Sequence, residues 1–168
     1  KKHLVTFIPA GQIDAVSLGN DDITEQHVME LLEHIEIEPA VDATASVIWL
    51  HGLGADGHDF EPIVPELKLP EKSGFRFIFP HAPMRSVTIN NGAEMRAWYD
   101  FVPHSETAGT SDIEESSKQL EYFIHREIER GIPSQHILLA GFSQGGVIAL
   151  KTGTRFDQRL AGILALST

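Results

Sequence analysis

The sequence contains no cysteine, and its basic residues are far outnumbered by its acidic ones. Without cysteine the chain has no disulfide, no thiolate metal site and no cysteine nucleophile. This composition fits a reducing compartment, and we expect a cytoplasmic protein. The 24 acidic and 13 basic residues give a formal net charge of −11. An acidic surface repels phosphate backbones, so we expect no nucleic-acid partner.

Long apolar runs are absent as well. No run approaches the roughly 18 residues that a transmembrane helix requires. The short apolar patch near the N-terminus is broken by Pro9 and followed by acidic residues, which argues against a signal peptide. A chain of 168 residues, 42% of them hydrophobic, is sufficient for one domain with its own core.

Short β-rich runs alternate with longer helical patterns from residue 35 onward, which predicts an α/β fold with a mostly parallel sheet flanked by helices. Each run is nearly continuous in apolar residues, as strands buried on both faces are. The expected strands are residues 46–50, 75–79, 136–140 and 161–166.

Three helices are expected around these strands. The first covers residues 59–67. The second covers residues 112–130, where Ser111 and Glu114 have the spacing of a capping box, and the third begins just after Ser143. The apolar residues at helical spacing that form the buried stripe of the second helix are Ile113, Leu120, Phe123, Ile124 and Ile128.

Two segments are less regular. Residues 1–34 show no clear period, although residues 3–10 resemble a strand and residues 23–35 a helix. We treat 1–34 as an N-terminal extension and 35–168 as the hydrophobic-core domain. Residues 80–110 are rich in proline, asparagine and aromatic residues, which predicts a long loop. It either contributes to function or is a surface excursion held by its aromatic side chains.

Residues 141–145 read GFSQG, the G-x-S-x-G pattern of a nucleophile elbow. A strand turns sharply into a helix with Ser143 at the apex, and side chains two positions away would collide with the neighbouring strand and helix. Gly141 and Gly145 avoid that collision, and Gly146 lets the helix lie close to the sheet. Unpaired N–H groups at the helix start favour a developing negative charge. We expect Ser143 to be a catalytic nucleophile; the alternative is a glycine-rich turn with an incidental serine.

Residues 51–59, HGLGADGHD, follow the first expected strand. A serine hydrolase needs a second N–H donor from such a loop, and Gly52 and Gly54 let the loop turn its amides inward. We expect the N–H groups of Leu53 and Gln144 to form the oxyanion hole, where one donor is worth about 10²–10³ in rate. The alternatives are a flexible loop and a metal site. The ligands of such a metal site would be His51, Asp56, His58 and Asp59. These residues lack the fixed helix or strand spacing that metal sites prefer, so we expect no metal and no cofactor.

Three stretches, WLHGLGADGHDF, PHAPMRSVTINNGAEMRAWYDF and AGFSQGGVIAL, together resemble the carboxylesterase and acyl-protein thioesterase family of α/β-hydrolases. The similarity covers about residues 35–168. It implies the α/β-hydrolase fold, with hydrolysis of carboxylic esters or thioesters through an acyl-enzyme at Ser143, and Leu53 and Gln144 supplying the oxyanion amides.

The same resemblance implies the substrates. They are acyl esters of short to medium chain length, lysophospholipids or S-acylated proteins, in a site walled by the loop that contains Met84, Met95 and Trp98. Family members begin near Met29, so residues 1–28 are an extension of the family's core or an added strand or partner contact. The resemblance is compatible with a homodimer and does not fix the oligomeric state.

No histidine follows Ser143, and Asp157 is the only carboxylate after it. The family places its acid and then its histidine after the serine. We therefore expect these two residues and the remaining strands to lie in sequence beyond this chain, which alone would be nearly inactive. Asp157 falls in a connection at the opposite end of the sheet and is expected to be a solvated carboxylate. His81, just after a strand, is the alternative base.

Two other functions compete with this interpretation. A non-catalytic α/β-hydrolase scaffold acting as a binding module is favoured by the missing histidine, and an acid and a histidine downstream would exclude it. A related hydrolase of dienelactone or peptidase type would favour cysteine or a different neighbour at the elbow. A panel of acyl esters of graded length distinguishes these enzymes.

Overall fold

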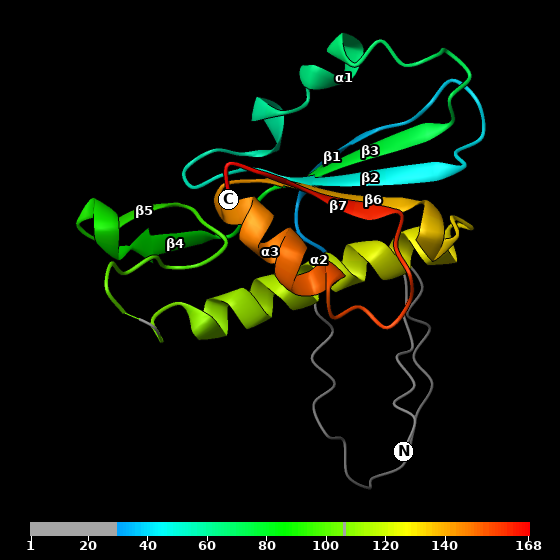
Figure 1. Cartoon of the computed structure of the whole chain (residues 1–168). Helices are drawn as coiled ribbons and strands as arrows, with labels where there is room; N and C mark the ends of the chain where they lie inside the picture. The colour runs from blue at the N-terminus through cyan, green and yellow to red at the C-terminus, as the bar shows by residue number, and fades with distance from the viewer. Residues whose placement is uncertain (1–29, 106) are drawn as a thin grey trace, which may run out of the picture.

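The structure, a computed structural model, describes residues 30–105 and 107–168. The strand predicted at 3–10 and most of the helix predicted at 23–35 lie outside these residues. A five-stranded sheet in the order β1-β3-β2-β6-β7 forms the centre of the fold (Figure 1). Its strands are β1 His34–Ile37, β2 Ala45–Leu50, β3 Phe75–Pro80, β6 Ile137–Phe142 and β7 Gly162–Leu166.

The four predicted strands are confirmed as β2, β3, β6 and β7, and all four run parallel. In β2, β3 and β6 this apolar character corresponds to burial on both faces, whereas β7, the outermost described strand on its side, is half-buried or exposed along its length. On β2, Val47 and Trp49 belong to one apolar core, whereas Ile48 and Leu50 belong to another on the opposite face. Side chains alternate across a strand, so one short run supplies both layers.

Helices α2 (Thr110–Glu129) and α3 (Gln144–Gly153) lie on one face of the sheet, and the short α1 (Ile63–Glu66) lies on the other (Figure 1). The buried stripe predicted for α2 is confirmed in its centre, where Leu120, Phe123 and Ile124 are in the core. The predicted capping box is wrong. The helix begins after Gly109, at φ 75°, with no side-chain cap.

The helix predicted at 59–67 is also shorter than expected. A 3₁₀ turn, Gly57–Asp59, comes first, and Asp56 and Asp59 close it by reciprocal capping bonds. The four-residue α1 follows only after Pro62, which has no N–H to continue a helix from the preceding turn.

Residues 34–37 form β1, although the helix predicted at 23–35 includes His34 and Ile35. This strand pairs antiparallel with β3, and Ile35 is opposite Phe79. The alternation HIEI explains the strand. Ile35 and Ile37 pack on the core beneath α1, whereas Glu36 bonds to Arg126 of α2.

The region 80–110 contains a hairpin that we predicted as irregular loop. Strands β4 (Met84–Val87) and β5 (Ala93–Arg96) pair antiparallel, with the 3₁₀ turn Thr88–Asn90 between them. Asn91 and Gly92 turn the chain with φ of 56° and 76°, a conformation that asparagine and glycine adopt most readily.

The connections reverse direction at β2. From β2 the chain moves to β3 on one side, then crosses to β6 on the other side and continues to β7. In open α/β sheets, ligands bind where the strand order reverses, beyond the carboxyl ends of the strands. Here that point lies between the ends of β2 and β6, where residues 51–59 and Ser143 emerge.

Candidate active site

Ser143 occupies the single residue between β6 and α3, with φ 50° and ψ −116°. A non-glycine residue in such a sparsely populated conformation costs about 1–3 kcal/mol and persists only where its surroundings impose it. Its N–H donates to the carbonyl of Leu166 at 2.8 Å, and its carbonyl accepts from Gly146 at 3.0 Å. Its half-buried side chain makes no hydrogen bond to any other described residue.

The glycines around Ser143 are required by close backbone contacts. A Cβ on Gly141 would stand 2.4 Å from the carbonyl of Gly145, and a Cβ on Gly145 would stand 2.5 Å from the carbonyl oxygens of Leu50 and His51. Both distances are shorter than real Cβ contacts. The first turn of α3 therefore rests directly on the backbone of β6 and of the end of β2.

Gly146 and Gly52 make the corresponding contacts with side chains. A Cβ on Gly146 would overlap the hydroxyl of Thr168, and one on Gly52 would stand 3.1 Å from the ring of Phe142. Gly54 has a φ of 76°, and a Cβ on it would stand 3.7 Å from the sulfur of Met95. The loop after β2 is thus fitted against both the elbow and the hairpin.

The two amides expected to form an oxyanion hole carry no hydrogen bond within the described part of the chain. These are the N–H groups of Leu53 and Gln144. The next amide, that of Gly54, donates to the carbonyl of Arg96 at 2.8 Å, which fixes the loop to the end of β5. Gln144 begins α3, so its N–H is one of the unpaired donors of a helix start.

The side chain of Gln144 has a structural task that the sequence pattern did not reveal. Its Oε1 accepts from Trp98 N–H at 2.8 Å, and its Nε2 donates to the Tyr99 carbonyl at 2.7 Å. This amide holds the segment after β5 against the first turn of α3. The only hint in the sequence was that a glutamine, with its side-chain amide, directly follows Ser143.

The three residues expected to wall an acyl site are placed differently from one another. Met84 is exposed on β4, and Met95 lies on β5 beside Gly54. Trp98 is 1% exposed and is part of the core, with its indole N–H bonded to the His51 carbonyl at 2.8 Å. Trp98 therefore lies beneath the loop rather than at its surface.

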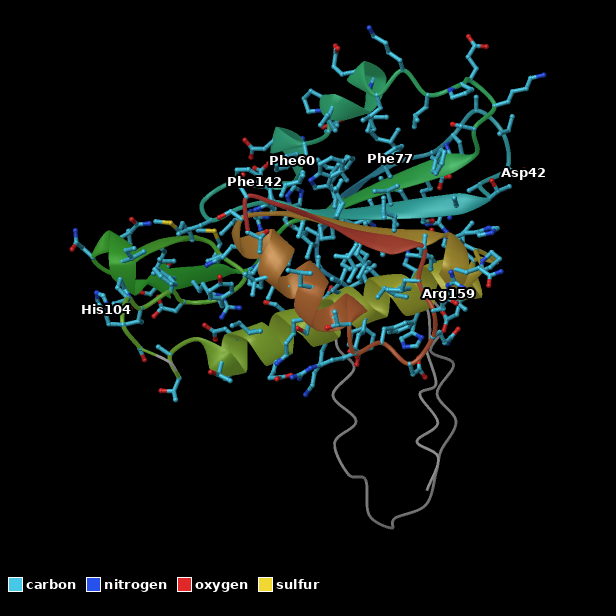
Figure 2. The ribbon with its side chains drawn as sticks, viewed as in Figure 1. Asp42, Phe60, Phe77, His104, Phe142 and Arg159 are labelled. Carbon is cyan, nitrogen blue, oxygen red and sulfur yellow. The ribbon has the colours of Figure 1, made fainter. Side chains whose placement is uncertain are left out.

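An aromatic pair beside the elbow was missed by sequence reasoning. Phe142 is 38% exposed, although it is adjacent to Ser143. Its ring lies 5.8 Å from that of Phe60, which follows the loop after β2 (Figure 2). The only signal for this pair was the apolar residue within GFSQG.

His51 is fully buried, and both of its ring nitrogens are engaged. Nε2 accepts from Ala82 N–H at 3.0 Å, which makes Nδ1 the protonated nitrogen that donates to the Gly52 carbonyl at 2.7 Å. Burial lowers the pKa of this imidazole because a charged ring is poorly solvated there. His51 is thus held neutral.

The other residues considered for proton transfer do not bond to Ser143. Nδ1 of His81 accepts from Gly57 N–H at 3.0 Å. His136 contacts the Thr44 carbonyl near the start of β2. Asp157 lies in the connection after α3, at the end of that helix remote from Ser143.

The residues considered as metal ligands have other contacts. Asp56 accepts from His58 N–H, and Asp59 accepts from Asp56 N–H, at 2.8 and 2.7 Å. Over residues 30–105 and 107–168, no group of three histidine or acidic side chains has the geometry to hold a metal ion. Within the same residues, no helix has the length and apolarity to span a membrane.

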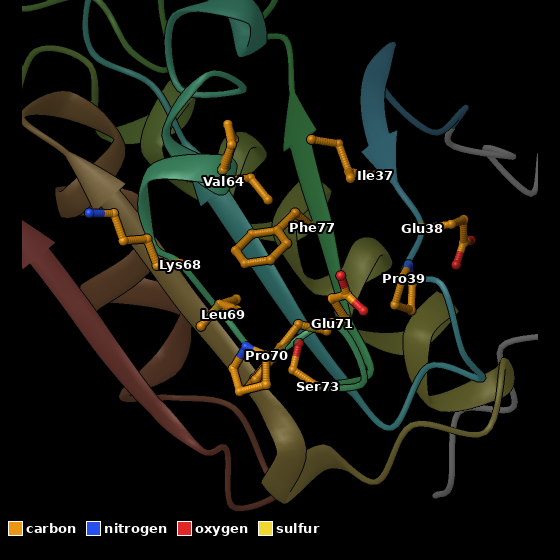
Figure 3. A pocket seen from close by; sticks show the side chains of 12 residues that line it. Ile37, Glu38, Pro39, Val64, Lys68, Leu69, Pro70, Glu71, Ser73 and Phe77 are labelled. Atoms are coloured by element: carbon orange, nitrogen blue, oxygen red, sulfur yellow. The ribbon is translucent and has the colours of Figure 1, made fainter.

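A pocket of about 200 Å³ lies on the α1 side of the sheet, beside the first residues of β3. Figure 3 shows Phe77 at its floor, with Val64, Lys68 and Leu69 along one wall and Ile37 on the other. It is therefore at the opposite end of the strands from Ser143.

Comparison with known proteins places these features in context. A family model described as phospholipase/carboxylesterase matches residues 32–168. An acyl-protein thioesterase 1 of Cryptococcus neoformans is 37% identical over 142 residues, which is 82% of this chain and 59% of that protein. An acyl-protein thioesterase 1 of Schizosaccharomyces pombe is 39% identical over 138 residues, 81% of this chain and 61% of that protein.

Solved structures give the same likeness. The crystal structure of Arabidopsis thaliana SOBER1 is 35% identical, with a TM-score of 0.65, and the match covers 71% of this chain and 59% of that one. The Zea mays acyl-protein thioesterase 2 is 27% identical, with a TM-score of 0.67, over 81% and 62% of the two chains. The chain spans about three fifths of the length of the curated relatives it matches.

Proposed function

The chain belongs to the phospholipase/carboxylesterase family, and from this premise we propose that it is the nucleophile-bearing part of a serine hydrolase of carboxylic esters or thioesters. The observation that carries the proposal is the backbone of Ser143, held at φ 50° between β6 and α3. Strain of this kind is retained where a site needs it. If Ser143 had no function, a glycine at position 143 would form the same turn with less backbone strain.

The proposed chemistry proceeds through an acyl-serine. Oγ of Ser143 attacks the acyl carbon while its proton passes to a base, and the carbonyl oxygen becomes an oxyanion facing the N–H groups of Leu53 and Gln144. Collapse of this intermediate expels the alcohol or thiol, which takes up the proton. Water then attacks the acyl-serine by the same steps and releases the acid.

We propose that the base and its acid partner lie in a part of the protein that this chain does not include, since it spans about three fifths of the length of its curated relatives. No described histidine contacts Ser143, and β7 is the outermost strand on its side of the sheet. Strands added beyond β7 would carry their loops to the same end as Ser143. The non-catalytic scaffold remains the competing function, because a protein without a base would bind an acyl compound and not turn it over.

The acyl group would lie against the apolar side chains that surround the elbow. Phe142 is exposed next to Ser143, Met95 is half-buried beside Gly54, and Met84 is exposed on β4 opposite Arg96. These flexible or flat side chains suit a chain of methylene groups. We therefore propose substrates with short to medium acyl chains, carried by a small alcohol, a lysophospholipid or a protein thiol.

The test uses the intact protein and acyl esters and thioesters of graded chain length. Ser143→Ala should reduce kcat by about 10⁶-fold, the loss found when a serine nucleophile is removed from a complete triad. A fluorophosphonate should label Ser143, identified by peptide mass spectrometry. Ser134→Ala, at the other end of β6, is the matched control and should retain wild-type activity.

Two results would reject the proposal. Turnover that survives Ser143→Ala would assign the chemistry to another group. Saturable binding of the same esters with neither turnover nor labelling would identify the protein as a scaffold.

A further inference from the structure

Two histidines join the loop after β2 to the loop after β3 by reciprocal hydrogen bonds. His51, at the end of β2, accepts the N–H of Ala82 on Nε2 at 3.0 Å. His81, at the end of β3, accepts the N–H of Gly57 on Nδ1 at 3.0 Å. Each ring belongs to one loop and binds a backbone amide of the other. We call these four residues the imidazole tie.

We propose that His51 and His81 are positioning residues that hold the loop carrying Leu53, and that they do so only as neutral imidazoles. The inference rests on the proposed function, in which the Leu53 N–H is an oxyanion donor. Neither histidine acts on the substrate. Their task is to keep the donor at the place where negative charge develops, because a small displacement of such a group costs rate steeply.

Imidazole chemistry restricts the tie to one protonation state. A ring nitrogen accepts a hydrogen bond only while its lone pair is free. Protonation of His81 would place a second N–H against the N–H of Gly57, so that an attraction becomes a repulsion. His51 is further restricted, because its Nδ1–H is already used by the Gly52 carbonyl.

The two loops are in close contact with each other, so a change in the hydrogen bonds of the imidazole tie should change the position of both loops. A Cβ on Gly57 would stand 2.5 Å from the carbonyl oxygen of Phe79 and 3.2 Å from Cε1 of His81. The 3₁₀ turn that begins at Gly57 thus lies directly against the end of β3. On the other side, Trp98 donates to the His51 carbonyl at 2.8 Å.

The charged groups around the tie differ between its two rings. His81 faces Arg96 from β5, His58 and Asp56 from the loop after β2, and Glu33 from the segment before β1. The His58 ring lies 5.5 Å away. Burial and then the charge of Arg96 lower the pKa of His81, and Asp56 opposes them.

His51 faces Asp56 and Asp59 from its own loop and His81 from the loop after β3, and burial outweighs them in lowering its pKa. His81 is only half-buried and His51 is fully buried, so charging the His81 ring requires less desolvation of a cation. The tie should therefore fail from the His81 side.

The experiment measures kcat and KM against pH for the intact protein and three variants. In His81→Asn, the amide Oδ1 occupies about the position of Nδ1 and accepts from Gly57 but cannot be protonated. This variant should keep wild-type kcat near neutral pH. At lower pH it should lose less activity than wild type, beyond the loss that protonation of the catalytic base causes in both proteins. His81→Ala should lower kcat about tenfold or more at neutral pH, with KM changed by less than about twofold. His58→Asn, an exposed neighbour, should match wild type near neutral pH.

The inference is overturned if His81→Ala has wild-type kcat, or if His81→Asn behaves as His81→Ala does. A second measurement is independent of turnover: the amide proton of Gly57 should shift upfield, with the midpoint of the His81 ring titration, as the bond is lost. An unchanged Gly57 resonance across that titration would also overturn it. Inactivity of the wild-type protein would instead reject the proposed function, while the Gly57 measurement still tests the tie.

Discussion

At the end of the sheet where β2 and β6 finish, the loops are held by hydrogen bonds in which backbone amides and carbonyls take part, and by close backbone contacts at glycines; the charged side chains there, such as Asp56 and Arg96, bond to the backbone. At the opposite end the chain is held by buried charge. There Glu127 of α2, 0% exposed, accepts from Arg76 at 2.7 Å, from Arg130 at 2.9 Å and from the Ser46 hydroxyl at 2.5 Å. Glu36 of β1 continues this network to Arg130 at 2.8 Å.

The difference follows from what each end has to do. Negative charge is proposed to develop on the substrate oxygen beside Ser143. Backbone N–H donors stabilise that oxyanion directly, whereas a charged side chain there would impose its own field on the reaction. The network at the other end lies at the far end of the strands from Ser143. It joins β1, β2, β3 and α2, and its charges are compensated by one another.

The largest effect is expected from a side chain introduced at the Ser143 end. Gly145→Ala would place a Cβ 2.5 Å from two backbone oxygens. We expect a loss of more than about 4 kcal/mol in the free energy of unfolding, because neither β2 nor α3 can move without the other. Gly162→Ala, whose nearest contact would be 3.6 Å away, is the control for denaturant unfolding. Equal stabilities would show that the site end tolerates bulk.

Removal of the central carboxylate should be the next largest. Glu127→Ala leaves Arg76 and Arg130 without their shared partner, and breaking a buried ion pair costs about 3–5 kcal/mol. Glu129→Ala, exposed on the same helix, should be near neutral. A small loss for Glu127→Ala would mean that water replaces the carboxylate, and the contrast between the two ends would then disappear.

Acidification should affect the charged end in a defined range. Burial raises the pKa of Glu36, but hydrogen bonds from Arg130 and Arg126 outweigh it and lower that pKa to about 2. A carboxyl with a depressed pKa in the folded state stabilises the protein above its unfolded-state value and loses that contribution as pH falls. We expect a loss on the order of 2 kcal/mol between about pH 4.5 and pH 2, measured by unfolding at each pH. Glu36→Gln should flatten this dependence; an unchanged slope would contradict it.

The smallest effect is expected where charges pair on the surface. Lys151 of α3 donates to Glu114 of α2, and both side chains have solvent access. Exposed pairs contribute little, because water and salt screen them. Lys151→Ala should leave Tm unchanged within error. A large decrease would show that burial is not what distinguishes the network of Glu127.

The sequence predicted the elements whose environment is uniform along their length. The runs at β2, β3, β6 and β7 are almost continuously apolar, with Ser46 and Arg76 as exceptions on β2 and β3, so their type was clear without knowledge of their neighbours. β1 was missed because its pattern depends on partners distant in sequence. The helix predicted at 23–35 ends just before Glu36, and the partners of Glu36, Arg126 and Arg130, are about 90 positions away in the sequence.

The candidate site was predictable in its local part only. The tight turn at Ser143 and its glycines follow from the spacing of GFSQG, since the contacts involved are those of one strand and one helix. The reciprocal bonds of His51 and His81 were not predictable, because each joins residues 24 or more positions apart. The start of α2 was missed because Asp112 accepts from the Asp100 amide, a tertiary contact that takes the place of a local cap.

The alternation along β2 limits how this gene can change in length. Deletion of one codon between positions 47 and 50 would exchange the contents of the two cores and turn the His51 ring away from Ala82. Deletion of two would restore the faces but draw His51 back by about 7 Å. Length variation among descendants of this protein should therefore accumulate in segments such as 67–73, while the distance from Ala45 to His51 stays fixed.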